Sequence, residues 1–212
     1  LFVIGGIVST RLPNITIPPE LQPGTTKKVI SKNRFLFLSL LLRHIGASSV
    51  WVILPILLVE QWGSELYHVS IVYVSNTLTA FVIMTLMASR IHISNVTKFK
   101  IGIGMTTFVF IGLSFVSEWW QAIPFMSLVG GTWAFLFIGG NFHLMENNPK
   151  STSTGIFSST ISISTVIGPV IGGSIAFLYD YTAVMYFAVV VVIASFVISL
   201  KVKEKTREIT NM

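Results

Sequence analysis

Long apolar segments separated by short polar ones fill most of the sequence. Six of these segments cover residues 35–59, 68–89, 100–118, 122–143, 153–178 and 181–200. Each has about the 20 residues that a helix needs to cross the hydrocarbon layer of a bilayer. The segments do not alternate polar and apolar residues with the period of two that a barrel strand needs. The pattern therefore predicts an all-α membrane protein, with six transmembrane helices in one bundle.

The composition agrees with lipid as the main solvent. Mean hydropathy is +0.79, and 10% of the 212 residues are charged, against about a quarter in soluble globular domains. The net charge is +6, but the basic residues form no patch interleaved with aromatics, so we expect no nucleic-acid partner. The sequence has no cysteine, which excludes a disulfide and a thiolate metal site. We expect no cofactor and no metal.

The basic residues predict the orientation, because Lys and Arg concentrate in cytoplasmic loops. They precede the first span, follow the sixth, and lie between the second and third and between the fourth and fifth. The alternate loops contain Glu and Asp but neither Lys nor Arg, and every basic residue except Arg43 lies on one side. We therefore expect a multi-pass protein of the plasma membrane with both termini in the cytoplasm.

The rest of the chain suggests a larger protein. Residues 1–10 are apolar but half as long as a span, so we interpret them as the end of a truncated transmembrane helix. Residues 11–34 are rich in proline and end in basic residues, as expected of a cytoplasmic linker. The six-helix bundle covers 35–200, and a cytoplasmic tail covers 201–212. This order predicts the second half of a twelve-helix protein, with the N-terminal half as its partner.

The spans differ in polarity. The third and sixth are apolar nearly all round, so these two helices can face lipid. In the fifth, Ser164, Gly168, Gly172 and Ala176 recur every four residues. Such a stripe of small residues lets a neighbouring helix approach closely. Pro169 is expected to kink or loosen the helix beside it.

Polar and aromatic residues near mid-depth predict a cavity that contacts a small-molecule substrate. They come from the first, second and fourth spans: Arg43, His44, Ser48, Trp51, Asn76, Trp133 and Asn141. Several of these residues could instead have a purely structural role. A serine hydroxyl often bonds to the preceding turn of its own helix, Trp133 could fill the core, and each asparagine could pair with another helix.

Arg43 has two interpretations. If the hydrocarbon layer begins near Phe37, Arg43 lies about 9 Å inside it, so its side chain could extend to the cytoplasmic interface as an anchor. Alternatively, its planar guanidinium binds an anionic or carbonyl partner, with His44 beside it as a proton acceptor.

The fifth span resembles a motif of the major facilitator superfamily. The antiporter motif of that family places glycines at fixed spacings around a Gly-Pro pair. This sequence matches at Gly155, Gly168, Pro169, Gly172 and Gly173, with Ser164 in place of one glycine. The resemblance implies helices seven to twelve of a twelve-helix transporter, in which seven and ten line the cavity, eight and eleven face the other half, and nine and twelve face lipid.

We expect a secondary transporter that works by alternating access. An intramembrane enzyme is less favoured, because the spans contain no Asp or Glu to converge with Arg43 and His44. A receptor or scaffold on the same fold remains an alternative, since fold does not fix function.

Overall fold

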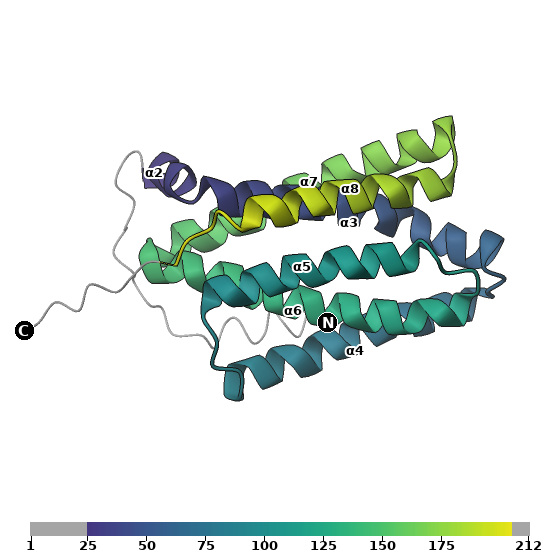
Figure 1. Cartoon of the computed structure of the whole chain (residues 1–212), viewed down its shortest axis with the longest axis horizontal. Coiled ribbons are helices and arrows are strands. Elements are labelled where there is room, and N and C mark those ends of the chain that lie inside the picture. The colour runs from purple at the N-terminus through teal and green to yellow at the C-terminus, as the bar shows by residue number, and fades with distance from the viewer. Residues whose placement is uncertain (1–24, 205–212) are drawn as a thin grey trace, which may run out of the picture.

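The computed structural model describes residues 25–204 (Figure 1). The predicted helix end at 1–10, residues 11–24 of the predicted linker and residues 205–212 of the tail lie outside the described residues. Within the described range, every regular element is a helix, and six helices are long and apolar enough to cross a membrane. The predicted all-α membrane class is confirmed.

The helices follow one another with short connections. Their bounds are α2 Thr25–Lys32, α3 Arg34–Ile56 with the π-helical turn η1 Leu57–Gln61, α4 Leu66–Ser89, α5 Asn95–Leu113, the 3₁₀ turn η2 Trp119–Gln121, α6 Ala122–Asn147, α7 Lys150–Leu178 and α8 Tyr181–Ser199. Part of the predicted linker is therefore the short helix α2, which the proline-rich composition did not indicate.

The third span is displaced from its predicted range, 100–118. Helix α5 runs from Asn95 to Leu113, because the side chain of Ser94 caps it by accepting a hydrogen bond from the backbone N–H of Thr97. The polar residues before Lys100, which resemble a loop, thus form the first helical turn. At the other end, the chain leaves the helix at Ser114.

The main helix contacts follow a pattern with approximate internal two-fold symmetry. Figure 1 shows α3, α7 and α8 along one side of the bundle and α4, α5 and α6 along the other. Helix α3 packs against α7 and α8, and α6 packs against α4 and α5, while α5 and α8 contact each other. Exchanging α3, α4 and α5 with α6, α7 and α8 reproduces these pairs, although α7 also packs on α6 and α8 while α4 makes no comparable contact with α3 or α5. Helices α3 and α6 are therefore equivalent central members of the bundle, and α4 and α7 are equivalent outer ones.

Glycines allow the close helix contacts. A Cβ atom added to Gly168 of α7 would lie 2.6 Å from the Cβ of Ser48 on α3, and one on Gly172 would lie 2.5 Å from the carbonyl oxygen of Ser49. Gly130 of α6 meets the backbone of Asn76 on α4 in the same way. Small residues thus occupy both of these symmetry-related contacts.

Candidate functional site

Arg43 is buried inside the bundle. Its side chain is 3% exposed, and its Nε and Nη2 each donate to the Oγ1 of Thr106 on α5 at 3.4 Å. Thr106 donates in turn to the carbonyl oxygen of Gly102 at 2.7 Å. Arg43 lies nine residues after the start of α3, or about 14 Å along its axis. The guanidinium thus contacts α5 inside the bundle.

Trp133 of α6 joins Arg43 to His44. The Arg43 Cζ lies 5.8 Å from the centroid of the Trp133 ring, within the range of a cation–π interaction. The His44 ring meets Trp133 edge-on, with centroids 5.1 Å apart and planes at 65°. Trp133 also contacts Phe137, which contacts Phe157 of α7. An aromatic row therefore runs from α3 across α6 to α7.

The described contacts satisfy the Arg43 charge only in part. Placing an arginine at mid-bilayer costs about 2.5–3.5 kcal/mol on insertion scales. A desolvated cation–π contact returns about 2 kcal/mol. The bonds to Thr106 are longer than the usual 2.7–3.2 Å, and they share one acceptor. A carboxylate or carbonyl oxygen would be a better partner for the planar fork.

The hydrogen bonding of His44 is also incomplete. Its ring is 6% exposed, and its buried Nδ1 makes no hydrogen bond of good geometry among the described residues, although the backbone of Leu40 lies near the ring. Leaving a polar group in this condition costs about 1–3 kcal/mol. Arg43 and His44 thus place a cation and a titratable nitrogen beside the same indole ring. This arrangement can bind an anionic group and exchange a proton.

The contacts described for the remaining cavity candidates involve residues outside this cluster. Ser48 is 5% exposed and covered by Gly168 of α7. Trp51 packs on Phe110, and its carbonyl accepts a hydrogen bond from Tyr73 of α4 at 3.4 Å. These residues contribute to helix contacts in the described structure.

The two asparagines also lie at helix contacts. Asn141 accepts a 3.4 Å hydrogen bond from Thr154 of α7 through its Oδ1. Asn76 lies where α4 meets Gly130. The structure therefore brings together Arg43, His44 and Trp133, while the contacts described for the other four candidates are with other residues.

The glycine motif of α7 divides into two faces. Ser164 is fully buried and donates to the carbonyl oxygen of Leu41 on α3 at 3.3 Å, and Gly168 and Gly172 face the same helix. Gly155 and Gly173 have open space around them. Pro169 lies inside α7, which is helical from Lys150 to Leu178.

Thr106 is the residue that sequence reasoning missed. It belongs to a helix that reads as almost wholly apolar, and it lies 63 residues from Arg43. A hydroxyl pair, Thr106 and Thr107, interrupts the apolar run near the middle of α5. That pair at mid-depth is the signal that could have indicated a partner for Arg43.

The comparisons with known proteins agree with the geometry. A family model described as Major Facilitator Superfamily matches residues 36–211. No curated protein sequence matches the chain significantly. The family match covers nearly all of the described bundle and confirms the resemblance to this family. The chain therefore belongs to the Major Facilitator Superfamily and is a multi-pass membrane transporter of the major facilitator type.

Proposed function

We propose that this chain is the C-terminal half of a secondary transporter, which moves a small solute across the plasma membrane by alternating access. The observation that carries the proposal is the hydroxyl-rich outer face of α7. A face of this kind suits a second bundle and a water-filled pathway better than it suits lipid.

The burial of the helices supports a missing partner beside α4 and α7. In an apolar stretch of 18 residues of each helix, 6% of the residues are buried in α4 and 17% in α7, compared with 67% in α3. The exposed face of α7 carries hydroxyl residues between the apolar side chains of Ile163, Val166 and Val170. The hydroxyl residues are Ser158, Ser159, Ser162, Thr165 and Ser174. Because α4 and α7 are related by the internal symmetry, both would face an N-terminal six-helix half.

The buried cluster is the proposed centre of substrate binding and coupling. Arg43 would bind an anionic or carbonyl group of the solute with its planar fork, and Trp133 would form an apolar wall beside it. His44 would take up a proton, which makes proton coupling the favoured mode. The solute would replace the long bonds to Thr106 with shorter ones.

The orientation follows from the distribution of charge. Basic residues gather at the ends of the helices where α3, α5 and α7 begin, and the opposite loops carry Glu60, Glu65, Glu118 and Asp180. Under the positive-inside rule, the first group is cytoplasmic, and so are both termini.

Uptake by the intact protein in vesicles tests transport. We expect labelled anionic solutes to accumulate in vesicles that contain the protein, and an imposed proton gradient to increase the accumulation. Binding without accumulation would indicate a receptor or scaffold instead. A chemically changed solute would indicate an enzyme.

Cysteine labelling tests the water-filled pathway, since this sequence contains no cysteine. Ser162→Cys lies near the middle of α7 on its exposed face, and Val190→Cys lies near the middle of α8, where the side chain is 65% exposed. In an intact protein with a cysteine-free N-terminal half, a water-soluble thiol reagent should modify the first and not the second. Equal modification of both would contradict the proposal.

A further inference from the structure

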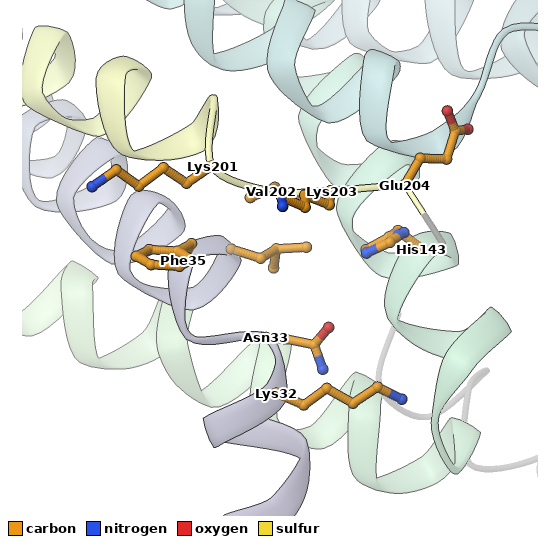
Figure 2. A pocket seen from close by; sticks show the side chains of 9 residues that line it. Lys32, Asn33, Phe35, His143, Lys201, Val202, Lys203 and Glu204 are labelled. Atoms are coloured by element: carbon orange, nitrogen blue, oxygen red, sulfur yellow. The ribbon is translucent and has the colours of Figure 1, made fainter. Parts of the chain in front are cut away.

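A basic cavity opens at the end of the bundle where the lysines and arginines gather (Figure 2). Its volume is about 300 Å³, and it lies between the start of α3, the end of α6 and the segment after α8. We propose that this cavity binds the phosphate group of an anionic membrane lipid. The proposal concerns a site separate from the Arg43 cluster and does not depend on the transported solute.

The charge of the lining favours an anion. Lys32, Lys201 and Lys203 contribute three positive charges, and Glu204 contributes one negative charge. In Figure 2, the carboxylate of Glu204 points away from Lys32 and Asn33. The cavity therefore keeps a net positive charge, which comes from α2 and from the segment after α8, two parts of the chain that are far apart in the sequence.

The positions of the lysines suit a ligand that enters between them. Lys32 reaches toward α6, where its Nζ lies 3.5 Å from the Oδ1 of Asn148. Lys201 turns the other way, with its Nζ 5.5 Å from the centroid of the Phe35 ring. His143, which is 6% exposed, contributes a ring from the α6 side. Figure 2 shows the Lys201 ammonium pointing away from Lys32 and His143, so Lys32 and Lys203 are the lysines that a phosphate in the cavity would contact.

The size and the apolar walls favour a lipid headgroup over a larger soluble anion. The cavity is at the lower end of the about 300–1,000 Å³ typical of ligand sites, which suits one phosphate and its glycerol. Leu36 and Val202 form part of the lining and are almost fully buried. An amphipathic lining of this kind matches the junction between a headgroup and its acyl chains.

Helix α8 provides a place for an acyl chain. Val190, Ile193, Val197 and Leu200 are exposed by 65%, 42%, 55% and 55%, respectively. Their spacing puts them on one side of the helix, and the row ends next to Lys201 of the cavity. A lipid bound here would have its acyl chain along α8 and its phosphate among the lysines. Basic pockets at the ends of membrane helices are suited to anionic lipids.

The test is lipid binding by the intact protein in detergent, measured by native mass spectrometry or calorimetry. The probes are short-chain phosphatidylglycerol, phosphatidylcholine of the same chain length, and inorganic phosphate. We expect the double variant Lys32→Gln/Lys203→Gln to bind phosphatidylglycerol on the order of tenfold more weakly, because each nearby lysine contributes measurably to the attraction of an anionic lipid. Unchanged melting temperatures would show that the variant is folded.

The control removes the same charge elsewhere. Lys28→Gln/Lys150→Gln alters two exposed lysines outside the cavity lining, and it should bind within about twofold of the parent, since both charges are screened by solvent. Glu204→Gln should bind about threefold more tightly, because it removes a repulsive charge, and a misfolded variant could not give this gain.

Four results would overturn the proposal. The first is an equal loss of affinity in the two lysine variants, and the second is no gain in Glu204→Gln. The third is phosphatidylcholine binding as tightly as phosphatidylglycerol. If millimolar inorganic phosphate displaced the lipid and bound with the same dependence on Lys32 and Lys203, the ligand would be a soluble phosphate and the lipid assignment would be wrong.

Discussion

The guanidinium of Arg43 and the hydroxyl of Thr106 form a buried pair that links α3 to α5. The hydroxyl accepts two N–H groups at 3.4 Å and donates onward to the carbonyl of Gly102. A charge at the centre of the bundle is thus connected to the backbone of a helix that otherwise reads as a lipid-facing element. Removing either partner therefore tests how the charge is stabilised.

Thr106→Val keeps the shape of the side chain but removes the acceptor. We expect it to destabilise the folded chain by about 1–3 kcal/mol, because a buried charged donor loses its partner. Thermal unfolding in detergent measures the effect. Thr107→Val is the matched control, since the Thr107 hydroxyl is buried without a hydrogen-bond partner in the described structure, and its removal should be neutral or slightly stabilising. A similar loss in both variants would contradict this role of Thr106.

Arg43→Lys tests whether the guanidinium does more than carry a charge. Lysine cannot reproduce the planar fork or stack on Trp133 in the same way. We expect folding to remain near normal while uptake by the intact protein falls at least about tenfold, the equivalent of about 1.4 kcal/mol of binding. Uptake assays together with thermal unfolding separate the two effects. Normal uptake in Arg43→Lys would make the residue a structural cation only.

His44→Gln tests proton coupling. Glutamine keeps a polar group at this place but cannot take up a proton at physiological pH. We expect solute to move down its own gradient, while accumulation driven by an imposed proton gradient is lost. His92→Gln, in the exposed loop before α5, is the control and should behave like the parent. Gradient-driven accumulation that survives in His44→Gln would assign coupling to another group.

Gly168→Ala tests the contact between α7 and α3. The added methyl group would overlap Ser48 and the carbonyl of Ile45, at 2.6 and 2.8 Å, so the helices must separate. Overpacking of this kind costs about 1–3 kcal/mol. The Cβ atom added by Gly173→Ala would meet open space in the bundle. This variant should therefore stabilise α7 slightly, because alanine has a higher helix propensity than glycine. Thermal unfolding of the chain compares the two, and equal effects would show that the stripe does not limit packing.

Single cysteines test the orientation. Gln61 ends the π-helical turn, and Ile93 lies in the opposite loop and is 40% exposed. An impermeant thiol reagent applied to intact cells should label Gln61→Cys and leave Ile93→Cys unlabelled until the cells are opened. Labelling of Ile93→Cys from outside would reverse the proposed topology.

The sequence predicted well what depends on local periodicity. The run lengths of apolar residues indicated six spans, and the four-residue spacing singled out the side of α7 that lies against α3. The start of α5 was predicted five residues too late, because Asn95, Thr97 and Lys98 read as loop residues although Ser94 caps a helix there. A capped first turn and a polar loop have similar compositions, so only the hydrogen bond distinguishes them.

The partners of the polar residues could not be predicted from local pattern. Arg43 meets Thr106 and Trp133 because three helices are rotated to bring those residues to one point, and this rotation depends on packing along the whole bundle. For the same reason, the sequence did not indicate that Asn141 meets Thr154 of α7. Helical spacing places residues on a side of their own helix but does not say which neighbour covers that side.

The π-helical turn after Pro55 changes the direction in which the chain leaves α3. In this turn the backbone N–H of Trp62 bonds to the carbonyl of Leu57, five residues back, so one residue is accommodated beyond the α-helical count. The turn is the last one of this helix, and the chain leaves it at Trp62. Trp62 is 7% exposed, and its carbonyl accepts a hydrogen bond from the N–H of Trp119 at 3.1 Å. The hydrogen bond between Trp119 and Trp62 thereby connects the first three-helix repeat to the start of the second, at the end of the bundle away from the lysines.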